Sequence, residues 1–146
     1  MKTQIILLIA IFTLIISSCG TKKVVNDNML YNTTWELEYI SGPRIAFEGL
    51  FPDKKPYISF DKETSEVRGN NSCNGYTAKY TLNESAISFG EPGPTTMMYC
   101  GEGEKVFVNM MEKINQYGFD EEGKLTLMLN DVPMMRFKKK LNDETN

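Results

Sequence analysis

The sequence predicts a mainly β domain of the α+β class: an antiparallel barrel-like or sandwich sheet of seven or eight short strands with one amphipathic α-helix packed on it. Three observations support this prediction. Several short segments alternate apolar and polar residues with a period of two, turn-forming residues separate these segments, and a single segment has apolar residues at helical spacing. A length of 146 residues, of which 41% are hydrophobic, fits one globular domain.

The first strand is predicted at residues 34–40, where Trp35, Leu37 and Tyr39 alternate with Glu36 and Glu38. This pattern gives the strand one apolar and one polar face, and it predicts that Trp35 is buried. The same reasoning predicts further strands at 57–60, 66–69, 75–82, 86–89, 117–119, 124–129 and 134–139, with turns at 61–65, 83–85, 120–123 and 130–133.

One segment, residues 103–118, has a different periodicity. Apolar side chains recur there every three or four positions, which predicts an amphipathic helix of about three turns that covers the open side or end of the sheet. Glu102 and Glu104 lie near its start, where the helix dipole favours negative charge. Before it, Pro92 and Pro94 exclude regular strand pairing and predict an irregular loop. The apolar positions of the helix are Val106, Phe107, Met110, Met111 and Ile114.

The first 18 residues have the composition of a secretory signal peptide. Lys2 precedes an apolar run at 5–16, which is shorter than the roughly 20 residues that span a bilayer. The stretch IISSCG that ends this region resembles the bacterial lipobox, and the resemblance implies that Cys19 is lipidated and holds the protein to a membrane. A soluble secreted protein is the alternative. We expect a signal peptide at 1–18, the lipidated cysteine and a flexible tether at 19–29, a folded domain at 30–140 and a polar tail at 141–146.

Two cysteines remain for the folded domain, Cys73 and Cys100. An even number in an exported chain favours a disulfide between them. Such a bridge joins residues that are 27 positions apart and would stabilise the fold by up to about 3.5 kcal/mol. Reduced structural thiols are the first alternative. Redox or metal chemistry is less favoured, because the cysteines lack CxxC spacing and the chain contains no histidine.

Composition narrows the function further. Without histidine the chain lacks the usual base for a nucleophile, so we predict no catalytic residue, and we expect neither a metal nor a cofactor. Methionine doublets at 97–98, 110–111 and 134–135 could bind Cu(I), but a role as core filler is favoured. After residue 18 the chain has 15 basic and 19 acidic residues, which argues against nucleic acid as a partner. The basic run RFKKK at 136–140 is interpreted as a solvated strand end.

Several segments together resemble the META domain, the HslJ-type lipoprotein family: TTWELEYISG, ISFD, VRGNNSCNGYTAKYTL, ISFG, TTMMYC, VFVNMMEKI and LTLML. The family pattern is a Gly, Cys, Asn, Tyr turn followed by a Thr, Met, Cys stretch. Here Gly69 is displaced from the cysteine, and Met98 and Tyr99 stand where Met and Ala are usual. The resemblance covers roughly residues 31–138. It implies a compact, mostly β domain with one helix, tethering as a lipoprotein and a link to heat-shock or antibiotic-stress responses, without an established reaction.

The predicted function is that of a non-enzymatic cell-envelope lipoprotein, anchored to the outer membrane and facing the periplasm, that acts as a stress-related binding module. A monomer that binds an envelope protein is expected; the alternatives are a periplasmic inhibitor of a hydrolase and a carrier of a small apolar ligand. The candidate binding surface comprises Asn70, Asn71, Asn74, Tyr76, Thr95, Thr96, Met97, Met98 and Tyr99. For the asparagines, turn geometry alone is the favoured explanation.

Overall fold

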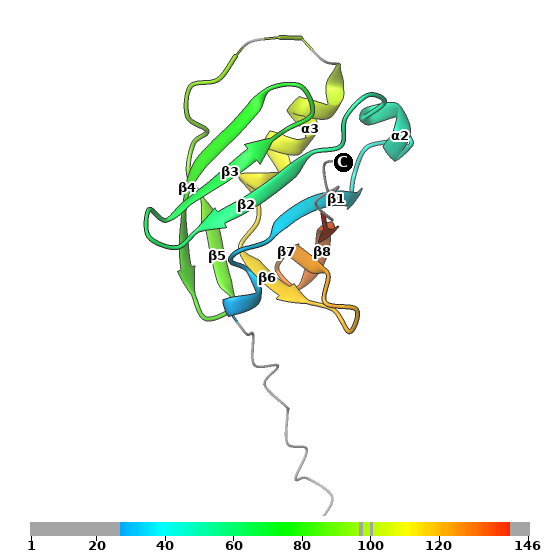
Figure 1. Cartoon of the computed structure of the whole chain (residues 1–146). Coiled ribbons are helices and arrows are strands. Elements are labelled where there is room, and N and C mark those ends of the chain that lie inside the picture. The colour runs from blue at the N-terminus through cyan, green and yellow to red at the C-terminus, as the bar shows by residue number, and fades with distance from the viewer. Residues whose placement is uncertain (1–26, 97, 100, 141–146) are drawn as a thin grey trace, which may run out of the picture.

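The computed structural model describes residues 27–96, 98–99 and 101–140, and this part of the chain folds into a closed antiparallel barrel (Figure 1). Each strand pairs with the next along the chain, and the last pairs with the first. The strands are β1 (Thr34–Ile40), β2 (Tyr57–Asp61), β3 (Glu66–Asn70), β4 (Gly75–Asn83), β5 (Ala86–Phe89), β6 (Gln116–Phe119), β7 (Leu125–Leu129) and β8 (Val132–Lys139). The predicted mainly β fold is confirmed, as a barrel rather than a sandwich.

The barrel interior is filled largely by the apolar side chains that the alternating pattern predicts. The prediction was wrong for Tyr39, which is 43% exposed while Ile40 is buried, because the register of β1 shifts between Leu37 and Tyr39. In β1, Trp35 and Leu37 are fully buried, and in β4 every second residue from Tyr76 to Tyr80 is buried. The indole of Trp35 donates a hydrogen bond to the carbonyl oxygen of Leu30 at 3.1 Å, so its polar group is satisfied inside the core. The largest fully buried side chains are Trp35, Tyr117, Phe107, Phe137, Leu30, Leu37, Ile58, Ile87, Met111, Leu125, Leu127 and Met135.

The turn between β7 and β8 is tighter than predicted. Asn130 and Asp131 alone connect the strands, and their φ values of 49° and 67° match a two-residue hairpin turn. The predicted turn at 130–133 was therefore wrong at its end, because Pro133 belongs to β8 and lies opposite Met128. The register shifts at that point, and such an irregularity accommodates a residue without an N–H group.

The predicted helix is α3 (Glu102–Met111), and its buried residues include Phe107, Met110 and Met111. The ring of Phe107 meets the edge of Tyr76 with centroids 5.4 Å apart, which fixes the helix on β4. Two short elements were not predicted, a 3₁₀ turn η1 (Asp27–Met29) and a helix α2 (Phe47–Leu50). A Cβ atom at Gly103 would lie 2.2 Å from the carbonyl oxygen of Leu50, so α3 packs directly on the end of α2.

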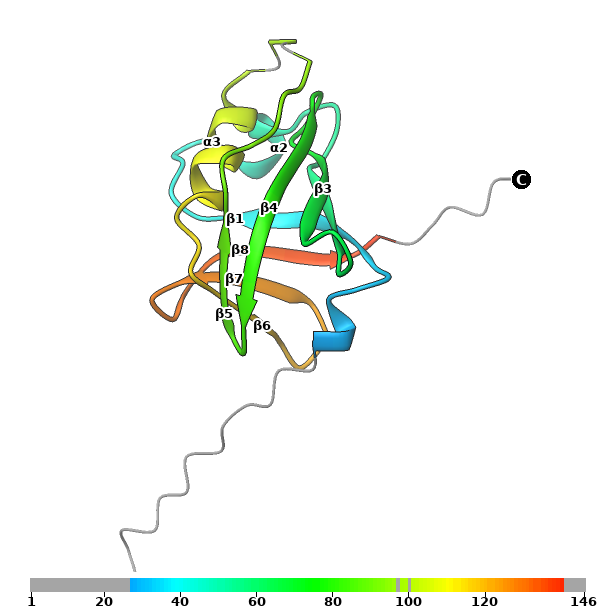
Figure 2. The same ribbon diagram turned by 90° about the vertical axis from the view of Figure 1, so that its left-hand side faces the viewer.

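Barrel closure is weakest between β5 and β6, where the ladder contains the single pair Ala86↔Gln116. The described part of the long connection between these strands comprises residues 90–96, 98–99 and α3, and in both views it lies at the end of the barrel opposite η1 (Figures 1 and 2). No helix within the described residues has the length and apolarity needed to cross a membrane. The fold therefore separates two ends, one formed by the loop and α3 and the other by η1.

Candidate functional site

The asparagine turn between β3 and β4 is buried. Asn70, Asn71, Asn74 and Tyr76 expose 7%, 2%, 1% and 3% of their surface, so they cannot themselves form a contact surface. The turn closes through a bond from the Asn71 amide to the carbonyl oxygen of Asn74 at 3.0 Å, and the amide of Ser72 donates to Oδ1 of Asn70 at 2.9 Å. Ser72 has a φ of 136°, a conformation that side chains rarely adopt. The favoured turn-geometry explanation thus agrees with where these residues lie.

Asn74 binds the loop that precedes α3. Its Nδ2 atom donates to the carbonyl oxygen of Met98 at 2.7 Å, while its Oδ1 atom accepts from the amide of Met98 at 3.1 Å. The same Oδ1 atom accepts from the hydroxyl of Thr96 at 2.9 Å. One amide side chain thus pairs with both backbone groups of Met98, in the way a neighbouring strand would.

Glu104 on α3 joins this arrangement. Its carboxylate accepts from Nδ2 of Asn74 at 2.8 and 2.9 Å and from Nδ2 of Asn71 at 2.8 Å. We call Asn71, Asn74 and Glu104 the asparagine clamp. Within the described residues, the remaining acceptor, Oδ1 of Asn71, is buried without a hydrogen-bond partner, and a buried unpaired acceptor costs about 1–3 kcal/mol. The clamp joins the turn to α3 through the carboxylate of Glu104, and it joins the turn to the loop through the neutral amide of Asn74.

The described contacts of the clamp are hydrogen bonds that hold the loop and α3 against the turn. Burial, followed by the nearby charge of Glu112, raises the pKa of Tyr76, so this phenol keeps its proton. Cys73 is disulfide-bonded, and its sulfur lies 3.7 Å from the carbonyl oxygen of Met98. Its predicted partner Cys100 lies outside the described residues, as does the predicted lipidation site Cys19, and both assignments stay predictions.

The other part of the predicted surface is exposed. Thr95 and Thr96 face solvent, Met98 exposes 64% of its surface and Tyr99 exposes 84%; Met97 lies outside the described residues. The hydroxyl of Thr95 donates to the carbonyl oxygen of Gly75 at 2.7 Å, which adds a second attachment between the loop and β4. We call Thr95, Thr96, Met98 and Tyr99 the loop surface. It presents two large side chains on a backbone that the clamp already holds.

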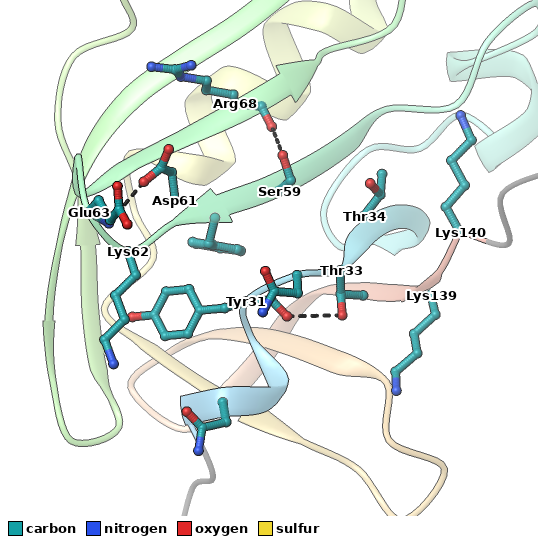
Figure 3. A pocket seen from close by; sticks show the side chains of 13 residues that line it. Tyr31, Thr33, Thr34, Ser59, Asp61, Lys62, Glu63, Arg68, Lys139 and Lys140 are labelled. Carbon is teal, nitrogen blue, oxygen red and sulfur yellow. Dashed lines mark hydrogen bonds between the residues drawn. The ribbon is translucent and has the colours of Figure 1, made fainter.

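A groove of about 1090 Å³ lies away from the loop surface, where η1, the start of β1, the β2–β3 turn and the end of β8 meet (Figure 3). Lys62 and Glu63 lie at one end in this view and Lys139 and Lys140 at the other, with Thr33 between them. The full lining is Asn28, Tyr31, Asn32, Thr33, Thr34, Ser59, Phe60, Asp61, Lys62, Glu63, Arg68, Lys139 and Lys140.

Two of the charged groups in the groove are already engaged. Arg68 pairs with Glu66, and Oδ1 of Asp61 accepts from the amides of Glu63 and Thr64 at 2.9 and 3.0 Å. The hydrogen bond from Thr64 holds the pKa of Asp61 below its usual value, so this carboxylate is ionised at neutral pH. The ammonium groups of Lys62, Lys139 and Lys140 have no carboxylate partner among the described residues.

The model of the META domain family matches residues 28–141, which span the whole barrel. The chain belongs to the META domain family. An NMR structure of a protein from Burkholderia xenovorans superposes with a TM-score of 0.59 at 21% sequence identity, covering 79% of this chain and 86% of that chain. This likeness shows a shared fold. No curated protein sequence matches the chain significantly.

Sequence reasoning on this META domain missed two features. Glu104 was assigned to the helix dipole, and nothing in its spacing from Asn71 and Asn74 revealed that all three meet. The run at 136–140 is a solvated strand end, as predicted, because its charged residues are exposed at the end of β8; what the prediction missed is that Lys139 and Lys140 also line the groove. No signal in the sequence located the groove, because the end of β8 reaches it only through the pairing of Trp35 with Lys139 in the closed barrel.

Proposed function

We propose that this META domain is the folded part of a non-enzymatic cell-envelope lipoprotein, anchored through Cys19 to the outer membrane and facing the periplasm, that binds an envelope protein through the loop surface in a stress response. Membership of the family supports the stress role, and the lipobox resemblance supports the anchor. Mass spectrometry of the mature amino-terminal peptide tests the anchor: a diacylglyceryl cysteine is expected, and an intact signal peptide or an unmodified Cys19 would contradict it.

The observation that carries the binding proposal is the exposure of Met98 and Tyr99 on a fixed backbone. Large exposed side chains on a preorganised segment lose little conformational entropy on binding, and tyrosine is enriched among residues that dominate protein interfaces. The loop is preorganised because Asn74 pairs with both backbone groups of Met98. The same geometry would serve an inhibitor of a hydrolase, whereas the side chains that fill the barrel give the carrier alternative no support.

Photo-crosslinking in the native envelope tests the interface. A photoreactive residue at Tyr99 is expected to give one discrete product, and the same residue at exposed Glu121 in the β6–β7 turn serves as the control. The substitution Met98→Ser in the Tyr99 crosslinking variant is expected to remove the product. Identical products from both positions would contradict a specific surface. A product that contains a lysozyme or protease would favour the inhibitor alternative over the other envelope partners.

Sensitivity to heat, detergent and antibiotics tests the stress role. We expect a strain with Met98→Ser and Tyr99→Ser to be as sensitive as a strain that lacks the gene. Val132→Ser is the matched control, because Val132 also exposes 56% of its surface but lies on β8. Unchanged sensitivity of the strain without the gene would contradict a stress function, and equal effects of both sets of substitutions would contradict the role of the loop surface.

A further inference from the structure

The groove beside η1 concentrates positive charge on a chain of net charge −3. After Arg68 and Asp61 are set aside as engaged, three lysines and one carboxylate, Glu63, remain. This local excess of cations over carboxylates has the sign opposite to that of the whole molecule. A groove of this kind attracts anions, because unpaired ammonium groups gain most from a ligand that supplies the missing negative charge.

Two of these lysines lie over aromatic rings, and one of the two rings, Tyr31, lines the groove. The ammonium of Lys62 lies 5.4 Å from the ring centre of Tyr31, and that of Lys140 lies 4.5 Å from the ring centre of Tyr57. Lys54 approaches the same Tyr57 ring at 5.8 Å, so two ammonium groups share one ring. Their mutual repulsion is relieved when an anion lies nearby, which adds to the preference for a negatively charged ligand.

The position of the groove indicates where that ligand comes from. Asn28 lines the groove and lies nine residues after Cys19, a distance of at most about 30 Å in an extended chain. If Cys19 carries lipid, the groove is held close to the membrane surface, where headgroups reach a high effective concentration. A site of modest affinity is then occupied, and the loop surface at the opposite end of the barrel is directed away from the bilayer (Figures 1 and 2).

We propose that the groove binds the headgroup of an anionic phospholipid that carries hydroxyl groups, such as phosphatidylglycerol. Lys139 and Lys140, at one end of the groove, bind the phosphate, and Lys62, at the other end, adds to the positive potential that attracts it. The hydroxyl of Thr34 has no partner within the described residues and donates to a headgroup oxygen, while Glu63 accepts from a headgroup hydroxyl. The inference that the ligand is a membrane lipid rests on the anchor proposed above. The inference that the groove binds a phosphate group does not depend on that anchor.

Nuclear magnetic resonance on the processed, lipidated protein tests this site. The protein is placed in phosphatidylcholine nanodiscs with and without phosphatidylglycerol, so that the anchor contributes equally to both samples. We expect phosphatidylglycerol to shift the backbone amide resonances of Thr34, Ser59 and Lys140 but not those of the loop surface. Soluble glycerophosphoglycerol, the same headgroup without acyl chains, is titrated in a second arm and is expected to shift the same resonances with lower apparent affinity.

Two variants with equal loss of charge make the test specific. Lys139→Gln with Lys140→Gln is expected to weaken glycerophosphoglycerol binding about tenfold or more. The control, Lys105→Gln with Lys113→Gln, changes exposed residues on and just after α3 and should leave binding unchanged. Equal weakening in both variants, a response to glycerophosphoglycerol without one to phosphatidylglycerol, or no response to either would overturn the proposal. If Cys19 proves unlipidated, phosphatidylglycerol nanodiscs added to the free protein still test the groove.

Discussion

The asparagine clamp and the groove differ in the burial and bonding of their polar side chains. At the asparagine clamp the polar side chains are buried and bind one another: Asn74 makes bonds to Thr96, Met98 and Glu104 and exposes 1% of its surface. At the groove, Lys62, Lys139 and Lys140 are exposed and have no carboxylate partner among the described residues. The asparagines of the turn therefore belong to the buried structure, whereas the three lysines of the groove face solvent.

This difference separates a structural role from a binding role by physical criteria. A buried, bonded polar group stabilises the fold because its loss leaves partners unsatisfied. An exposed charge without a partner adds little to stability and is available to a ligand. Substitutions at the clamp should therefore lower the free energy of unfolding, and substitutions at the groove should change it little.

The largest effect is expected for Asn74→Ala. The substitution removes the bonds of the Asn74 side chain to Thr96, Met98 and Glu104, so we expect a loss of about 3 kcal/mol in the free energy of unfolding. Urea denaturation under oxidising conditions measures it. Thr96→Ala, which removes a single bond to Asn74, is the matched control and should cost about 1 kcal/mol. Equal small losses in both variants would show that the clamp is not a unit.

A second effect at the same end comes from packing. Gly103→Ala places a Cβ atom 2.2 Å from the carbonyl oxygen of Leu50 and 2.7 Å from the ring of Phe51, so α3 must move. We expect a net loss of about 1–2 kcal/mol, because overpacking outweighs the better helix propensity of alanine. Asn109→Ala on the exposed face of α3 is the control and should not destabilise. Thermal unfolding measures the stability of both variants. A Gly103→Ala variant that is more stable than the parent would contradict this prediction, because it would mean that α2 moves away from the added methyl group without loss of stability.

The sequence predicted the local features of this molecule well. The period-two alternation correctly predicted where the strands lie and that Trp35 is buried, because side chains point to alternate faces along a strand. Contacts between distant segments were beyond it: the bond between Asn71 and Glu104 joins residues 33 positions apart. The groove depends on where η1 and the end of β8 meet, which only closure of the barrel determines.

A third effect is a pH dependence at the groove end. The bond from the Thr64 amide lowers the pKa of Asp61, so its ionised form contributes stability above about pH 4, and this contribution is lost as the pH falls through the lowered value. We expect Asp61→Asn to reduce the loss of stability between neutral and acidic pH, measured as the shift in urea midpoint. Some pH dependence should remain, because the pKa of Glu66 is also lowered, chiefly by Arg68. An unchanged pH profile would show that the turn does not depend on this charge.

The smallest effect is expected at the groove itself, and it is the measurement that separates the two ends most clearly. Lys139→Gln with Lys140→Gln removes two charges that have no carboxylate partner within the described part of the chain, together with the contact of Lys140 with the Tyr57 ring, so the free energy of unfolding should change by less than about 1 kcal/mol. Lys124→Gln is the contrast, because Lys124 pairs with Glu38 at 3.2 Å and with Glu122 at 2.9 Å and should shift the urea midpoint more. A large loss in the groove variant would assign Lys139 and Lys140 to the fold. If the free energy of unfolding is unchanged but the variant no longer responds to the headgroup, Lys139 and Lys140 act in ligand binding.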